Sequence, residues 1–173
     1  AAGLVRLTRL ERNPMQATTR GVGRMMSDAV VRGAERLWVG LGGSATNDGG
    51  CGMAEALGWR FLDEQRNPLP PSPAGLSQLA RVEPPAEPFP AHVTSLSDVR
   101  NPLLGPEGCS RTFAPQKGAT HDQVEDLEAI LEHICDVVTD VSPVAGMEVA
   151  GDGAAGGIGW GLRVFCGAET RSG

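Results

Sequence analysis

The segment RLWVGLGGSATNDGG, residues 36–50, indicates the fold around it. Its first six residues form a short apolar run, which is typical of a buried strand. Residues 42–50 then form a glycine-rich loop with no helix or strand propensity of its own, and residues 52–57 resume as a helix that stops at Gly58. The sequence therefore predicts a strand, a long glycine loop and a helix in direct succession.

This loop has the composition of an anion-binding site. Glycine allows backbone N–H groups to approach a phosphate, and a helix start adds partial positive charge. The polar members of the loop are Ser44, Thr46, Asn47 and Asp48. No Gly-Lys-Ser/Thr closes the loop, so it is not a Walker A motif. A tight turn that needs glycine for positive φ explains the composition equally well.

Helices and strands alternate on both sides of this segment. The 3.6-residue spacing of Val22, Met25, Met26, Ala29 and Val30 predicts a core-facing helix that begins near Thr18–Thr19 and ends at Gly33. Further strands are expected at 59–63 and 93–99, and a glycine-rich apolar helix at 154–168. Residues 68–90 hold most of the prolines, which predicts a long surface excursion. The alternation indicates an α/β protein.

The clearest helix is expected over residues 121–141. Thr120 and Gln123 form a capping box. A buried stripe is expected at Val124, Leu127, Leu131, Ile134 and Val138.

Composition excludes several classes of protein. The chain has 173 residues, about one domain's worth, and a net charge of −6. This charge argues against nucleic acid and anionic membrane surfaces as partners.

No apolar run approaches the ~18 residues of a spanning helix. No signal peptide is visible, and the chain is expected to be an internal piece of a longer protein. Four widely separated cysteines, in no metal-ligand or disulfide pattern, favour a reducing, cytoplasmic setting.

Four further positions could carry chemistry. Lys117 is the only lysine beside fourteen arginines and precedes a capped helix, where its ammonium could meet a phosphate; the alternative is a solvated surface lysine. Asp98 ends a predicted strand, although turns often begin with Asp. Residues 151–156 match GxGxxG formally, but only a very short strand candidate precedes them, so close glycine packing is the plainer interpretation. Cys51 fits a small buried thiol better than an activated thiolate.

Taken in order, six segments resemble the bacterial two-domain glycerate kinases. The most distinctive is GLGGSATNDGG at residues 40–50, which is similar to the family's GIGGSATNDGG. The others are Arg12-Asn-Pro14 with Ala17-Thr-Thr19 and Gly21-Val-Gly23, then Phe61-Leu-Asp63, Asp98–Leu103, Pro115–Thr120 and Gly153–Gly157. Departures occur at Met15, Arg20, Cys51, Ala114 and Asp152. Asp152 places a negative charge beside a glycine loop, which would repel a phosphate bound there.

The resemblance implies that residues 1–173 are the inserted α/β domain of a glycerate kinase, a single domain with a mixed sheet flanked by helices. The family's second, Rossmann-like domain is absent, so this chain is expected to carry half a site and to be inactive alone. The implied partners are D-glycerate, ATP with Mg²⁺, and that second domain.

The resemblance also supplies a set of site residues. Asp48, Asp98 and Lys117 are the implied catalytic residues, the two carboxylates accepting a proton or holding Mg²⁺. The implied substrate- or phosphate-binding residues are Gly42, Gly43, Ser44, Thr46, Asn47, Gly49 and Gln116. The alternatives are an NAD-binding oxidoreductase fragment built on residues 151–156 and a non-catalytic ligand-binding module.

Overall fold

The computed structural model describes residues 3–173. A three-stranded parallel sheet runs in the order β1-β4-β5, and a separate two-stranded antiparallel ribbon is formed by β2 and β3. The strands are β1 (Arg36–Gly40), β2 (Arg60–Leu62), β3 (Arg81–Glu83), β4 (His92–Ser97) and β5 (Glu169–Ser172). The expected α/β class is confirmed, with the parallel and antiparallel pairings in two sheets rather than one mixed sheet.

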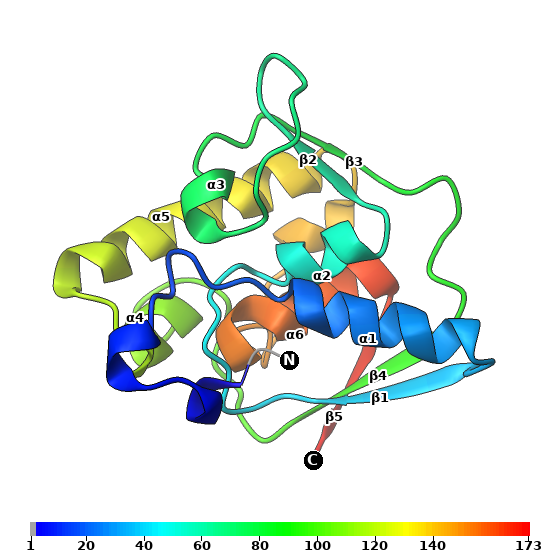
Figure 1. The fold of residues 1–173 in the computed structure, drawn as a ribbon, viewed down its shortest axis with the longest axis horizontal. Coiled ribbons are helices and arrows are strands. Elements are labelled where there is room, and N and C mark those ends of the chain that lie inside the picture. The colour runs from blue at the N-terminus through cyan, green and yellow to red at the C-terminus, as the bar shows by residue number, and fades with distance from the viewer. Residues whose placement is uncertain (1–2) are drawn as a thin grey trace.

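Of the six α-helices, α1, α2 and α6 lie between the parallel sheet and the ribbon, whereas α3, α4 and α5 lie toward the left of the view in Figure 1. They are α1 (Arg20–Val31), α2 (Cys51–Ala56), α3 (Pro73–Leu76), α4 (Cys109–Phe113), α5 (His121–Thr139) and α6 (Ala154–Cys166). Short 3₁₀ turns occupy Leu4–Arg6, Arg9–Glu11, Pro115–Lys117 and Pro143–Gly146. No helix within residues 3–173 is long and apolar enough to cross a bilayer.

The helix α5 forms as its sequence predicts. Thr120 caps it, accepting from the Gln123 backbone N–H at 3.3 Å, while Gln123 Oε1 accepts from the Thr120 N–H at 3.0 Å. All five stripe residues are buried. Leu131, Ile134 and Val138 pack with the antiparallel ribbon and α6 into the main core, whereas Val124 and Leu127 pack with Ala114 in a smaller cluster. In the main core, Phe165 makes edge-to-face contacts with Trp59, Phe61 and Trp160.

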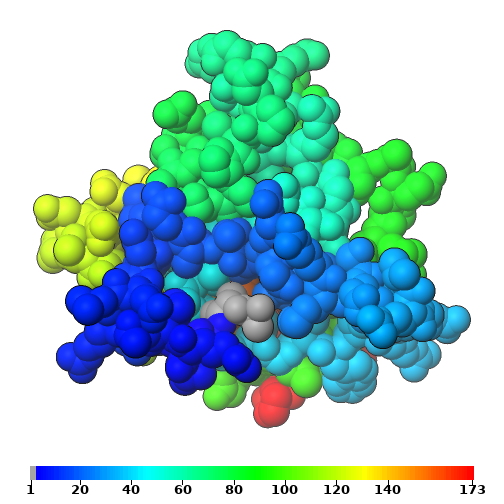
Figure 2. Space-filling model, in the orientation of Figure 1, coloured from blue at the N-terminus to red at the C-terminus, as the bar shows by residue number. Residues whose placement is uncertain are grey.

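The helix α1 matches its prediction less completely. It begins after Thr19 and ends near Gly33, as expected. Met26 is buried, whereas Met25 is 56% exposed. Met25 lies at the wall of a cavity between α1 and β1, so this part of the stripe faces open space instead of packed side chains. Figure 2 shows that the residues preceding β1 form a band across this face of the molecule.

Two regions differ from the sequence-based expectation. The excursion at 68–90 is not wholly superficial, because Leu76, Leu79 and Val82 are buried and α3 and β3 lie within it. Pro73 sits at the start of α3, where a missing N–H costs nothing. The final helix ends at Cys166, and residues 169–172 form β5, which pairs with β4 through Thr94↔Glu169.

Candidate functional site

The glycine loop between β1 and α2 is fixed by a buried carboxylate. Asp48 accepts hydrogen bonds from the Thr19 N–H at 2.7 Å, the Thr19 hydroxyl at 2.8 Å, and the Gly50 and Gly52 N–H groups at 3.2 Å. Burial raises the pKa of Asp48, and these four donors oppose that effect. Both oxygens are therefore used to hold the loop against the start of α1.

Lys117 is not a solvated surface lysine. Its side chain is only 2% exposed, and its Nζ donates to the Thr46 carbonyl at 2.7 Å, across 71 positions of sequence. Burial lowers the pKa of Lys117 to about 8. An ammonium carries three N–H donors, and the described contacts use one of them. Two donors are thus free to meet an anion.

A cavity of about 250 Å³ lies where this lysine meets the loop. Four predicted site groups converge on it: the loop residues Gly42 to Ser44, the exposed carboxylate Asp98, Gln116 and Lys117. Leu41, Val99, Phe113 and Ala155 complete its wall. The predicted convergence of the loop and Lys117 on one concave face is confirmed.

The remaining predicted residues lie behind this cavity, outside its lining. Thr46 and Asn47 are buried, and Asn47 Nδ2 donates to Ser110 Oγ at 3.0 Å. Gly49 packs against Leu131 and Trp160, and Asp48 holds the loop. These residues support the loop from within, and the cavity itself is lined by its first three residues.

The glycines of residues 151–161 serve close packing against the loop. The Gly49 N–H donates to the Gly156 carbonyl at 3.2 Å, and a Cβ on Gly156 would lie 1.9 Å from the Thr46 oxygen. Residues 147–150 form no strand. The dinucleotide interpretation therefore lacks the strand it needs, and glycine packing explains the motif.

The charge of Asp152 does not face this cavity. Asp152 forms a two-point ion pair with Arg163, which also donates to the Val144 carbonyl at 2.7 Å. Asp152 lines a different hollow, beside Trp160. The expected repulsion of a phosphate by Asp152 is thus neutralised locally.

Residues that sequence reasoning had not assigned also shape the site. Arg12 Nη1 donates to the Gln116 carbonyl at 3.1 Å and so fixes the turn before Lys117. Ala155 adopts φ 55°, an unusual left-handed conformation for a residue with a Cβ, and lines the cavity. Arg12 belongs to the Arg12-Asn-Pro14 segment that resembles the family, whereas nothing in the sequence around Ala155 indicates its unusual backbone conformation. Cys51 is buried, and burial raises its thiol pKa well above the usual value, in agreement with the expected inert thiol.

Comparisons with known proteins match this chain to one family. The model of the glycerate kinase family matches residues 1–173. A Bacillus subtilis protein named glycerate kinase is 41% identical over 176 residues, and Escherichia coli K12 glycerate 2-kinase is 38% identical over 178 residues. Each alignment covers 100% of this chain and 46% of the relative.

A solved structure shares the fold. The Salmonella typhimurium LT2 protein assigned as glycerate kinase 2 matches with a TM-score of 0.92 at 39% identity. The match covers 99% of this chain and 46% of the other. This chain thus spans about half the length of the curated relatives that it matches.

Proposed function

Because the chain belongs to the glycerate kinase family, we propose that it is the inserted domain of an enzyme that transfers the γ-phosphoryl group of ATP to D-glycerate. The observation that carries this proposal is the convergence of Lys117, Gln116, Asp98 and the loop residues 42–44 on one cavity. A buried cation, an amide, a carboxylate and a glycine backbone are the groups that position and neutralise a phosphoryl group.

Lys117 supplies the positive charge of the site. Phosphoryl transfer passes through a loose transition state, so catalysis depends mainly on positioning and on neutralising the phosphoryl oxygens. The Thr46 carbonyl holds the ammonium in place, which means that no reorganisation is needed when the anion arrives. Gly42 and Gly43, both exposed, offer a backbone that a phosphate or the glycerate carboxylate can approach closely.

Asp98 is the carboxylate in a position to act on substrate. It lines the cavity and is exposed, whereas both oxygens of Asp48 already accept hydrogen bonds from the protein. In the proposed step, the glycerate hydroxyl oxygen forms a bond to the γ-phosphorus as the bond to the β–γ bridging oxygen breaks. The hydroxyl proton passes to Asp98 and ADP leaves.

Mg²⁺ is the expected companion of the nucleotide. It usually binds through one or two carboxylates together with phosphate oxygens and water. Asp98 accepts the proton in the proposed step, and within residues 3–173 no group of three or more potential metal ligands exists, so we expect the phosphate oxygens, water and the second domain to hold the ion. Bound there, the ion would neutralise charge on the phosphates.

The proposed second half of the site lies on a Rossmann-like domain outside this chain. The chain's 46% share of its relatives leaves room for such a domain. Closure of two domains commonly supplies the dry, aligned environment that transfer needs. On this basis, the 173-residue piece alone retains weak anion binding and loses turnover.

ADP release by the full-length parent tests the proposal. With ATP, Mg²⁺ and D-glycerate we expect ADP to accumulate, and we expect no glycerate-dependent reduction of a nicotinamide cofactor. Nicotinamide reduction without ADP release would instead support the oxidoreductase alternative. Turnover by the 173-residue piece equal to that of the parent would overturn the division of the site between two domains.

A further inference from the structure

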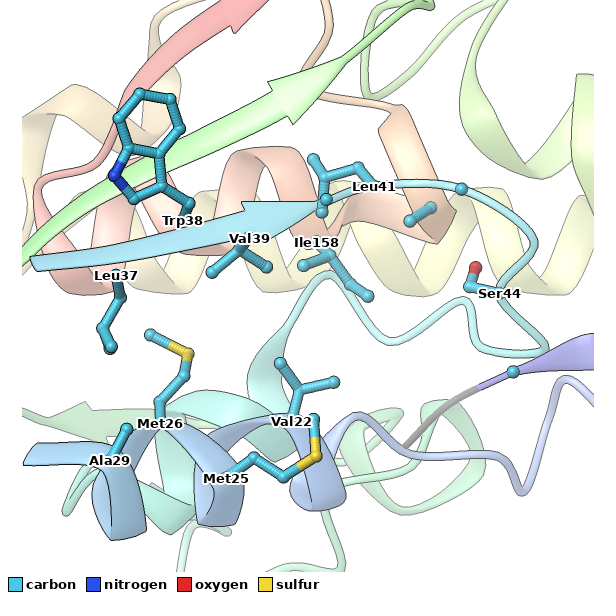
Figure 3. A pocket seen from close by; sticks show the side chains of 14 residues that line it. Val22, Met25, Met26, Ala29, Leu37, Trp38, Val39, Leu41, Ser44 and Ile158 are labelled. Atoms are coloured by element: carbon cyan, nitrogen blue, oxygen red, sulfur yellow. The ribbon is translucent and has the colours of Figure 1, made fainter. Parts of the chain in front are cut away.

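A second, larger cavity lies beside the proposed phosphoryl site. It occupies about 410 Å³ between α1 and β1 (Figure 3). Its walls are mostly apolar, and the side chains of Val22, Met26, Leu37, Val39 and Ile158 point into it. The volume falls within the ~300–1,000 Å³ typical of small-molecule sites.

One side of this cavity is the open edge of β1. The Glu35 carbonyl accepts from the His92 N–H at 2.9 Å, and the Leu41 N–H donates to Leu96 at 2.8 Å. Main-chain groups alternate in direction along a strand, so those of Trp38 and Gly40 point away from β4. Both residues line the cavity. It therefore offers main-chain donors and acceptors beside apolar walls.

The two cavities share a wall, made of Leu41, Gly42, Ser44 and Ala155. Ser44 is 6% exposed, and its hydroxyl has no hydrogen-bond partner within residues 3–173. A buried hydroxyl left unpaired is costly, so a hydrogen-bond partner brought to this wall would be favourable. Ser44 thus marks the passage from the apolar cavity to the one that contains Lys117.

We propose that the apolar cavity receives the purine base of the phosphoryl donor; this inference rests on the proposed kinase function. A purine has flat apolar faces and an edge on which a donor lies next to an acceptor. The faces match Val22, Met26 and Ile158, and the edge matches the Trp38 carbonyl and Gly40 N–H. The sugar then passes Ser44, and the phosphates reach Lys117.

An apolar side chain from the rest of the protein is a poorer occupant of the cavity. It would bury the main-chain groups of Trp38 and Gly40 and the Ser44 hydroxyl without partners, at a cost for each polar group. A base with a polar edge satisfies these groups and uses the same apolar walls.

The test uses the full-length parent with Ala29→Phe, which fills the cavity from α1. We expect the KM for ATP to rise at least tenfold while the KM for D-glycerate changes less than twofold. Val31→Phe is the matched control, because Val31 is exposed on the same helix and lies outside the cavity lining; it should leave both constants unchanged. An unchanged KM for ATP in Ala29→Phe, or equal rises in both constants, overturns the proposal.

Photolabelling of the unsubstituted parent with 8-azido-ATP gives a readout that does not depend on variant folding or on turnover. We expect the label on peptides from residues 20–44 or 154–166, which together line the cavity, and label confined to other segments overturns the base site. A parent that is labelled on these peptides but releases no ADP with D-glycerate contradicts the kinase proposal alone. The two failures are therefore distinguishable.

Discussion

The region around α5 and the region around the glycine loop differ in which side chains they bury. The helix α5 buries an apolar stripe, and its polar residues are largely exposed. The loop and its neighbours bury Asn47, Asp48 and Lys117, and they depend on several residues at positive φ.

This difference separates a region that stabilises the fold from the region that we propose takes part in phosphoryl transfer. Local rules are broken most often at functional sites, and the cost is met elsewhere in the structure. Here the conventional core packs directly beneath the unconventional loop, because Leu131 and Trp160 both lie against Gly49. The comparison predicts that substitutions in the two regions have different signatures, which the following experiments examine.

The largest effect is expected from Gly156→Ala. The new Cβ would lie 1.9 Å from the Thr46 carbonyl oxygen, at a φ of +77° that a residue other than glycine rarely adopts. The free energy of unfolding should fall by more than about 4 kcal/mol, measured by urea denaturation of the 173-residue chain. Gly33→Ala has a similar φ with open space around it, so it should cost only about 1–2 kcal/mol. Equal losses for the two variants would contradict close packing as the cause.

Lys117→Met should separate activity from stability. Removing a preorganised charge donor is expected to lower kcat/KM of the parent about 10²–10³-fold. Replacing a buried cation with an apolar side chain of similar length should leave the free energy of unfolding unchanged or raise it. Arg32→Met, which removes an exposed cation immediately after α1, is the control and should preserve activity. A strongly destabilised Lys117→Met would place the lysine among the structural residues.

Ile134→Ala should show the reverse signature. Ile134 is completely buried in the region around α5, and its truncation is expected to cost about 2–5 kcal/mol of unfolding free energy. Both KM values of the parent should remain within twofold, since the residue lines neither cavity. Val31→Ala, at an exposed position, should cost almost nothing in the same assay. A selective rise in one KM would show that the two regions are not independent.

The activity and the stability should depend on pH in opposite directions, because both depend on the protonation of Lys117. Burial lowers the pKa of Lys117 to about 8, so the ammonium is lost as the pH rises through about 8. The kcat/KM for ATP should then fall by up to about tenfold per pH unit, as the free enzyme titrates. The free energy of unfolding should rise as the pH increases from about 8 to 10.5, because the unfolded chain holds that proton more tightly than the folded chain. In Lys117→Met neither change should appear.

The smallest effect is expected at the start of α5. Thr120→Ala removes the cap that accepts from the Gln123 N–H, and should lower the free energy of unfolding by about 1 kcal/mol. Thr120→Ser keeps the hydroxyl and should restore most of this loss. Thermal unfolding followed by circular dichroism is sensitive enough to resolve the pair. Equal melting temperatures for Thr120→Ala and the unsubstituted chain would contradict the capping role of Thr120.

How much could be predicted from the sequence depends on how local each signal is. The bounds of α5 follow from a capping box and a periodic stripe within one segment, so they were predictable. The strand β5 was not, because Glu169–Ser172 is exposed and polar and becomes a strand only by pairing with β4. The buried positions of residues 68–90 were hidden by prolines, which mask the periodicity around them.

The site shows the same limit. Composition alone singled out Lys117, and the family motif singled out the loop. Burial of Lys117 could not be read from the sequence, because its partner is the Thr46 carbonyl 71 residues away. The use of Asp48 by Thr19 is likewise a long-range contact. Motif matching selected segments that converge on the cavity, and only the fold distinguishes lining residues from supporting ones.

The spacing of the three parallel strands has a consequence during synthesis. β1, β4 and β5 are recruited from residues 36–40, 92–97 and 169–172, so the sheet is complete only when nearly the whole segment has left the ribosome. At a synthesis rate of about 5–20 residues per second, β5 is made on the order of ten seconds after β1. During that interval the nascent chain displays an unfinished sheet and the apolar walls beside it. This domain should therefore depend on chaperones during translation more than its modest size suggests.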